Sequence, residues 1–217
     1  MPMVEIKGLK KFYSERTVLD IGDLTVNDGE VLALAGANGS GKTTLLKILA
    51  GLIKPDEGTF AVPERILFMP QQSYAFRGSL EKNILIGLRN GSTDELLEKT
   101  GLLHLKGKKA SSLSGGELQR LAFCRVIVRE ADLLLLDEPT SACDAEGTKL
   151  ILSALKEYSK KTGCTVIMST HSSDVALEAA DRLLILSSGK PLVSGTPEAV
   201  ITGGNTIWTK PIVTEIE

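Results

Sequence analysis

The stretch VLALAGANGSGKTTLLKIL, residues 31–49, decides the fold. It opens with five apolar residues that favour a buried strand and closes with a helical pattern. The Gly-rich loop between them meets the pattern G-x-x-x-x-G-K-[ST] with Gly36, Gly41, Lys42 and Thr43. Glycines allow backbone angles that turn N–H groups inward around phosphate oxygens. The stretch therefore predicts a strand, a phosphate-binding loop and a helix, with a plain Gly-rich turn as the alternative.

The same loop, together with a second strand end, predicts a nucleotide site. Lys42 would reach the β- and γ-phosphates, and the Thr43 hydroxyl would hold Mg²⁺. The helix N-terminus adds the positive end of its dipole. The run LLLLDEP ends in Asp137 and Glu138. Asp137 is placed to hold Mg²⁺, directly or through water. Glu138 alternates to another side of the strand and can polarise a water for in-line attack. Without the upstream loop, two polar residues at the mouth of a strand would be the better interpretation.

A second glycine-opened helix start follows at LSGGELQR, residues 113–120. Ser114, Gly115 and Gly116 stand directly ahead of a helical pattern, so free backbone N–H groups there can face an anion. The alternative is an ordinary capped helix.

Alternating strand-like and helical segments predict an α/β fold with a mainly parallel sheet. The apolar runs suit strands that are buried on both faces. They lie at 31–35, 66–69, 133–136, 166–169 and 183–186, and the helical patterns lie at 42–51, 117–130, 146–161 and 172–180.

Two further regions depart from this alternation. Residues 4–26 read as short β segments broken by Gly8, Gly22 and the pair Asp28-Gly29, forming an antiparallel edge. Residues 71 to about 112 are polar, helical and Gly-punctuated, with Ser79 and the pair 92–93 as expected helix N-caps. A hairpin-like KPLVSG and a helix at PEAVI come later, and the tail NTIWTKPIVTEIE is left unassigned. We expect one domain over 1–217, with a core at 1–70 and 131–217 and a helical subdomain at about 71–130.

Composition excludes several classes of protein. The chain has 217 residues, 25 basic and 27 acidic, with a net charge of −2, so no basic excess indicates nucleic acid. Aromatic residues make up 4 %, too few for a base-stacking surface. The apolar runs are too short to span a bilayer, and MPMVEIKGLKKFY lacks the apolar centre of a signal peptide. The three scattered cysteines favour free thiols in a reducing cytosol.

Taken in order, GANGSGKTT, LSGGELQR, LLLLDEP and THSSD resemble the nucleotide-binding subunits of ABC (ATP-binding cassette) transporters. The resemblance covers residue 4 to about residue 201, and LSGGELQR is its most specific part. It implies a P-loop NTPase core with an antiparallel N-terminal β subdomain and an inserted helical subdomain. It also implies ATP, Mg²⁺, a second ATPase subunit with ATP between the two, a transmembrane permease and, in importers, a substrate-binding protein. The expected place is the cytoplasmic face of the membrane.

The resemblance assigns residues to ATP in two groups. Within one chain, the phosphates contact Gly36, Ala37, Asn38, Gly39, Ser40, Gly41, Lys42, Thr43 and Thr44. From the second chain, the family contributes a helix start and a loop across the interface, which here are Ser114, Gly115, Gly116, Glu117 and Asp144. The family more often has Leu at the position of Cys143, a small departure that leaves Asp144 in place.

The resemblance also implies roles for three further side chains. Gln71 matches the glutamine that senses Mg²⁺ and the attacking water, with the adjacent Gln72 as the alternative. His171 matches the histidine that contacts the γ-phosphate. Tyr13 matches the aromatic residue that stacks on adenine, with Phe12 as the alternative. Glu138, His171 and Gln71 are thus the expected catalytic residues, and Thr43, Gln71 and Asp137 the expected Mg²⁺ ligands.

Three functions fit these motifs to different degrees. The first is an ATPase subunit that energises a bacterial or archaeal transporter, favoured by a single cassette that ends soon after the last core helix. The second is a non-transport ABC ATPase, whose translation-type members carry two cassettes and whose repair members insert coiled coils or zinc modules. The third is a silent binding module, disfavoured because the catalytic residues are present. The stretch RILFMPQQSYAFRGSLEKNILIGL is similar to cassettes of bacterial uptake systems for oxyanions such as tungstate, with export as the alternative.

Overall fold

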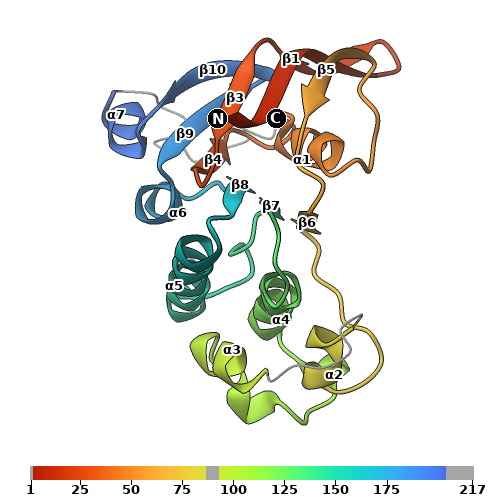
Figure 1. Cartoon of the computed structure of the whole chain (residues 1–217), viewed down its shortest axis with the longest axis vertical. Coiled ribbons are helices and arrows are strands. Elements are labelled where there is room, and N and C mark those ends of the chain that lie inside the picture. The colour runs from red at the N-terminus through yellow and green to blue at the C-terminus, as the bar shows by residue number, and fades with distance from the viewer. Residues whose placement is uncertain (1, 87–92, 204–217) are drawn as a thin grey trace, which may run out of the picture.

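The computed structural model describes residues 2–86 and 93–203. Its main sheet has six strands in the order β10-β9-β4-β8-β7-β6 (Figure 1). The pairs from β9 to β6 are parallel, as predicted, and β10 runs antiparallel to β9 as the expected hairpin. The strands are β4 (Val31–Ala35), β6 (Ile66–Met69), β7 (Leu133–Asp137), β8 (Thr165–Ser169), β9 (Arg182–Ser187) and β10 (Lys190–Gly195).

Both faces of the main sheet are covered, which explains its continuous apolar runs. Along β7, Leu133 and Leu135 face the hydrophobic cluster that contains α1 and the N-terminal strands. Leu134 and Leu136 face the opposite cluster, formed with the helices that follow in sequence. The helices are α1 (Lys42–Leu49), α4 (Gly115–Ile127), α5 (Ala145–Thr162), α6 (Ser173–Ala179) and α7 (Pro197–Thr202), close to the predicted ranges.

The N-terminal strands form a second sheet of their own. It joins β1 (Pro2–Tyr13), β2 (Arg16–Ile21), β3 (Leu24–Asn27) and β5 (Glu57–Ala61) in antiparallel pairs. The expectation of an edge broken at Gly8 was wrong, because β1 continues through that residue with φ 56° and changes its partner from β3 to β2 there. A Cβ on Gly58 would lie 2.3 Å from the Gly8 carbonyl oxygen, so β1 and β5 approach closely at this point.

The region after Gln71 is less helical than predicted. Its described residues, 72–86 and 93–112, hold only short elements, which are α2 (Leu80–Ile84), α3 (Asp94–Lys99), η1 (Leu103–Leu105) and η2 (Ala110–Ser112). Ser79 caps α2 by accepting a hydrogen bond from the Lys82 N–H, as expected. Thr93 occupies the N-cap position of α3 without capping through its hydroxyl, and Ser92 lies outside the described residues.

These short helices pack with α4 around a separate hydrophobic cluster. They lie at the opposite end of the molecule from the N-terminal sheet (Figure 1). The domain boundaries at about 71 and 130 stay a prediction. The tail NTIWTKPIVTEIE also lies outside the described residues.

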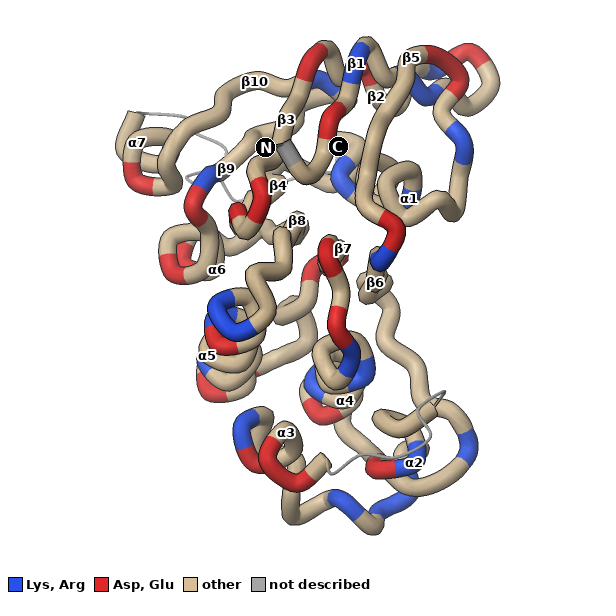
Figure 2. Tube along the Cα trace, in the orientation of Figure 1, with Lys and Arg blue, Asp and Glu red and all other residues tan. Residues whose placement is uncertain are grey.

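Acidic and basic residues are interspersed along the trace (Figure 2). Within residues 2–86 and 93–203, no helix combines the length and the apolar character that crossing a bilayer requires.

The three cysteines are free thiols that differ in burial. Burial raises the pKa of Cys124 to about 12 and that of Cys164 to about 11. Burial also raises the pKa of Cys143, which is only partly buried. Because the thiolate is the nucleophile, all three react more slowly at neutral pH than an exposed thiol does.

Alkylation of the native protein should therefore discriminate among the cysteines. We expect iodoacetamide at roughly pH 8 to label Cys143 first, and Cys124 and Cys164 only after unfolding. The rate at Cys143 should continue to rise with pH above the range of an ordinary thiol, because its deprotonation is shifted upward. Peptide mass spectrometry of time points checks this order. Labelling of native Cys124 ahead of Cys143 would contradict it.

Candidate functional site

The loop between β4 and α1 has a backbone that only glycine allows at two points. Gly36 has φ 145°, and a Cβ there would lie 2.2 Å from the Leu186 carbonyl oxygen. Gly41 has φ 103°, and a Cβ there would lie 2.9 Å from the Val18 carbonyl oxygen. The loop is thus folded tightly against β9 and β2, and α1 begins directly behind it.

Two polar side chains of this loop are buried in a way that suits an anion. Lys42 is 5 % exposed, and its Nζ donates to the carbonyl oxygens of Gly36 at 2.7 Å and Ala37 at 3.2 Å. Burial lowers the pKa of Lys42, while the Glu138 and Asp137 carboxylates oppose that shift. Ser40 is 4 % exposed, and its Oγ has no hydrogen-bond partner among the described residues. A buried hydroxyl without a partner beside a buried ammonium fits phosphate oxygens.

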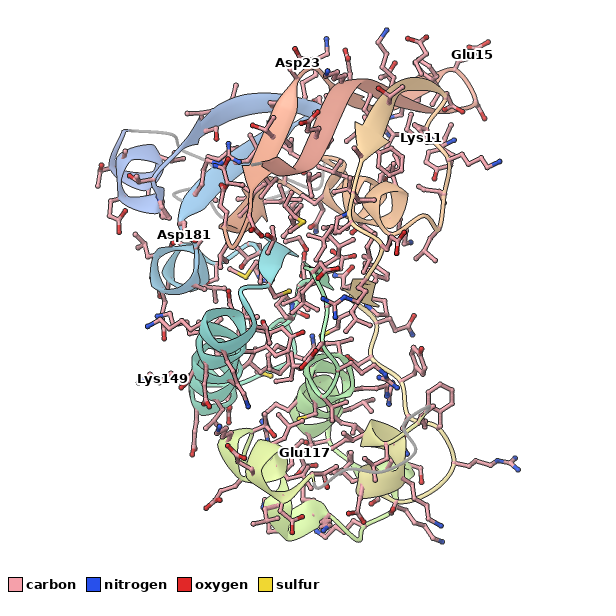
Figure 3. All side chains as sticks on the ribbon, in the orientation of Figure 1. Lys11, Glu15, Asp23, Glu117, Lys149 and Asp181 are labelled. Atoms are coloured by element: carbon pink, nitrogen blue, oxygen red, sulfur yellow. The ribbon has the colours of Figure 1, made fainter. Side chains whose placement is uncertain are left out.

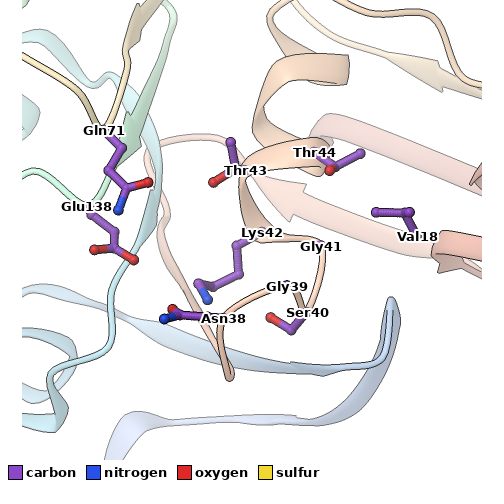
Figure 4. Close-up of a pocket in the computed structure, with 10 residues that line it drawn as sticks. All are labelled: Val18, Asn38, Gly39, Ser40, Gly41, Lys42, Thr43, Thr44, Gln71 and Glu138. Atoms are coloured by element: carbon purple, nitrogen blue, oxygen red, sulfur yellow. The ribbon is translucent and has the colours of Figure 1, made fainter. Parts of the chain in front are cut away.

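A cavity of about 350 Å³ opens over this loop (Figure 4). On its far side, Gln71 and Glu138 face the loop residues. Val18 on β2 also lines the cavity, and the sequence offered no signal for it beyond strand alternation. The lining residues are Val18, Asn38, Gly39, Ser40, Gly41, Lys42, Thr43, Thr44, Gln71 and Glu138.

At the end of β7, two hydroxyl groups donate hydrogen bonds to the same carboxylate oxygen. The Thr43 hydroxyl donates to Asp137 Oδ1 at 3.1 Å, and the Ser169 hydroxyl donates to the same oxygen at 2.6 Å. Asp137 is 2 % exposed. A carboxylate and a hydroxyl at this spacing are the ligand types that Mg²⁺ prefers, so the residues present fit that ion. Ser169 was not predicted from the sequence, where it appears only as the polar end of an apolar run.

Glu138 follows with a left-handed backbone, φ 50°. A non-glycine residue in this region costs about 1–3 kcal/mol and persists where its surroundings hold it. Its side chain is 11 % exposed, and Oε2 lies 3.2 Å from Nδ1 of His171. Glu138 and His171 also line a second cavity of about 210 Å³. The structure therefore brings together the two residues that were predicted to act on the γ-phosphate.

Gln71 and its alternative Gln72 face different spaces. Gln71 lines the cavity above the loop, whereas Gln72 lines another one beside Tyr74 and Arg125. Tyr13 lies at the end of β1 with 51 % of its surface exposed, and it does not line the 350 Å³ cavity. Its stacking role, like that of its alternative Phe12, stays a prediction.

The second glycine-opened helix start does not line this cavity. Ser114 caps α4 in a capping box, in which its Oγ accepts from the Glu117 N–H and Glu117 Oε2 accepts from the Ser114 N–H at 2.7 Å. The N–H bond from Ser114 lowers the pKa of Glu117. Figure 3 shows Glu117 in the lower half of the molecule, at the end away from Lys11 and Glu15. Asp144 caps α5 by accepting from the Gly147 N–H at 2.8 Å.

Within one chain, the predicted site residues therefore form two separate groups. The loop residues, Asp137, Glu138, His171 and Gln71 gather around one end of the main sheet. Ser114, Gly115, Gly116, Glu117 and Asp144 stand at helix starts outside the 350 Å³ cavity.

Comparison with known proteins agrees with this geometry. The family described as ABC transporter matches residues 19–141. The aliphatic sulfonates import ATP-binding protein of Streptomyces avermitilis is 38 % identical over 86 % of this chain and 74 % of its own length. The sulfate/thiosulfate import ATP-binding protein of Caulobacter vibrioides is 38 % identical over 91 % of this chain, which spans 66 % of that relative.

Solved structures show the same fold. The cbiO1 protein of Clostridium perfringens, part of the ABC transporter complex cbiONQ, is 28 % identical with a TM-score of 0.77, over 93 % of this chain and 91 % of its own. An ATP-binding cassette of an ABC transporter in its ADP conformation is 23 % identical with a TM-score of 0.81, over 94 % of this chain and 96 % of its own, and supports the fold alone. This chain belongs to the ABC transporter family, as an ATP-binding and ATP-hydrolysing member of it.

Proposed function

We propose that the protein powers a membrane importer by closing two copies of itself over ATP and opening them after hydrolysis. The observation that carries this proposal is that the phosphate-binding loop and Glu138, the expected catalytic carboxylate, line one cavity. Lys42 and Ser40 stand in the loop, and Glu138, which contacts His171, faces the loop across the same cavity. A phosphate-binding loop and a residue that positions the attacking water are recurring parts of sites that hydrolyse the γ-phosphate.

Within one chain, each side chain has a distinct task. The loop N–H groups and Lys42 hold the phosphates and balance their charge. The Glu138 carboxylate accepts a proton from the attacking water, which raises the nucleophilicity of that water. His171, in contact with Glu138, positions the γ-phosphate and stabilises its charge as the bond to the leaving oxygen breaks. Tyr13 is proposed to stack on adenine.

Magnesium is the cofactor that this site fits. Thr43 and Asp137 would hold the ion, with Gln71 at the edge of the same cavity. When bound, Mg²⁺ would neutralise charge that develops on the phosphate oxygens.

The second chain would complete the site through its own α4. Ser114 offers a hydroxyl, and Gly115 and Gly116 offer backbone N–H groups at the helix start, which suit the terminal phosphate of ATP. Glu117 and the Asp144 loop would lie along the same interface. ATP then binds the closed pair better than the open one, so hydrolysis releases the closure.

The remaining partners are proposed from the relatives. Those named above are import ATP-binding proteins, so we propose a transmembrane permease, a substrate-binding protein and a place on the cytoplasmic face of the membrane. Other relatives carry names for spermidine/putrescine and zinc import at 32–33 % identity. The proposal is therefore import, and an oxyanion cargo stays a prediction.

Loss of the loop lysine tests the cradle. Lys42→Ala should weaken ATP binding at least about tenfold, because a charge-assisted bond to phosphate contributes roughly 1.5–3 kcal/mol. Titration with a fluorescent ATP analogue measures the dissociation constant. Lys47→Ala, on the same helix and outside the cavity lining, is the matched control. Equal ATP dissociation constants in the two variants would count against the assignment of Lys42 to phosphate binding.

A further inference from the structure

Gln119 is a buried amide on α4 that reaches the catalytic loop. Only 2 % of the surface of Gln119 is exposed to solvent. Its Nε2 donates to the Glu138 carbonyl oxygen at 2.9 Å, and its Oε1 accepts from the Ser73 hydroxyl at 3.0 Å. A single side chain thus joins three segments: α4, the loop after β7 and the segment after β6.

The orientation of this amide follows from its partners. A backbone carbonyl only accepts hydrogen bonds, so the atom next to the Glu138 oxygen must be the NH₂ group. The amide oxygen then faces Ser73, whose hydroxyl can donate. Both ends of the Gln119 amide are satisfied, which is what a buried polar group requires.

The Glu138 backbone needs such support. Its φ of 50° lies in the left-handed region, and the next residue, Pro139, restricts it further toward extended conformations. Its N–H donates to Ser169 Oγ at 2.9 Å, which fixes one side of the residue. The bond from Gln119 to its carbonyl fixes the other side. Because the carboxylate projects from this backbone, its direction depends on both bonds.

We propose that Gln119 is a positioning residue that holds the Glu138 carboxylate in its hydrolytic direction and ties it to the helix headed by Ser114. This inference rests on the proposed function, in which Glu138 polarises the water. Gln119 lies in the same helix as Ser114, so a shift of α4 when Ser114 engages a second chain's ATP reaches Glu138 through this amide. A helix start that serves one ATP molecule is thereby linked to the carboxylate that hydrolyses another.

The test compares two uncharged substitutions with the parent chain. Gln119→Met keeps the length of the side chain and loses both hydrogen bonds. Ser73→Ala keeps the bond to Glu138 and loses only the other one. We expect Gln119→Met to lower kcat for Mg-ATP by about tenfold or more, with the ATP dissociation constant and binding stoichiometry within about twofold of the parent, and Ser73→Ala to lower kcat less than about twofold.

The binding stoichiometry shows that the variant protein is folded and intact, so a lower kcat is not a smaller active fraction. An equal fall of kcat in both variants would overturn the assignment, because the effect would then follow from any break in the buried amide contacts. An unchanged kcat in Gln119→Met would overturn it as well, while leaving the proposed function in place. A parent chain that binds ATP and does not hydrolyse it would contradict the proposed function itself, and this inference falls with it.

Discussion

Glu138→Gln is expected to stop turnover almost completely while ATP still binds. The substitution keeps the size and the hydrogen-bonding reach of the side chain and removes the carboxylate that takes the proton from water. General-base catalysis contributes about 100-fold to 10,000-fold, so kcat should fall by at least about 100-fold. The ATP dissociation constant should stay within about twofold, because the loop and Lys42 are unchanged. Phosphate release and ATP titration on the same preparation give both quantities.

A matched control is Glu178→Gln, an exposed carboxylate on α6 outside both cavities. It should leave kcat within about twofold, since surface substitutions away from special features have small effects. Full turnover in Glu138→Gln would remove Glu138 from its role. The 3.2 Å contact between Glu138 and His171 would then be structural only.

Ser114→Arg is expected to abolish ATP-dependent pairing of two chains. The arginine side chain occupies the space at the start of α4 where a second chain's phosphate would lie, and the hydroxyl is lost. Each single chain should still bind ATP with its own loop, because Ser114 does not line that cavity. Dimer formation should weaken at least about 100-fold, as when a central interface residue is lost. Sedimentation velocity with and without ATP measures the pairing.

Ser114→Asp separates phosphate binding from helix capping. Aspartate is as good an N-cap as serine, so α4 should keep its stability. Its negative charge would repel a phosphate at the same place, so pairing should still be lost. A dimer that survives this substitution would show that Ser114 is only the cap seen in the capping box.

The core of the fold and site was predictable because its signals are local. The loop pattern predicts glycine at positions 36 and 41, where the backbone has a positive φ. The apolar runs predict strands that are covered on both faces of the sheet. The continuous strand through Gly8 was missed because a glycine in isolation reads as a break, whereas here β1 continues through it with φ 56°. The close approach of β5 depends on the missing Cβ of Gly58. The short helices after Gln71 were overestimated because their polar pattern lacks the length that stabilises a helix.

Side chains that act through long-range contacts were not predictable. Gln119 and Ser169 are separated from Glu138 by 19 and 31 positions. The sequence around each of them does not predict a hydrogen bond to Glu138. A glutamine among apolar residues on the buried side of α4 is the one signal that could have pointed to Gln119. The assignments of Tyr13, Gln71, Ser114 and Asp144 came from the family resemblance and stay proposals.

The solution mass of purified Glu138→Gln protein, with and without Mg-ATP, tests most directly whether α4 serves a neighbour's nucleotide. Hydrolysis is blocked in this variant, so the closed state should accumulate. The account predicts a shift from monomer to dimer when Mg-ATP is added, and no shift when Ser114→Arg is introduced into the same protein. A variant that holds ATP in full stoichiometry and remains a monomer would contradict the account.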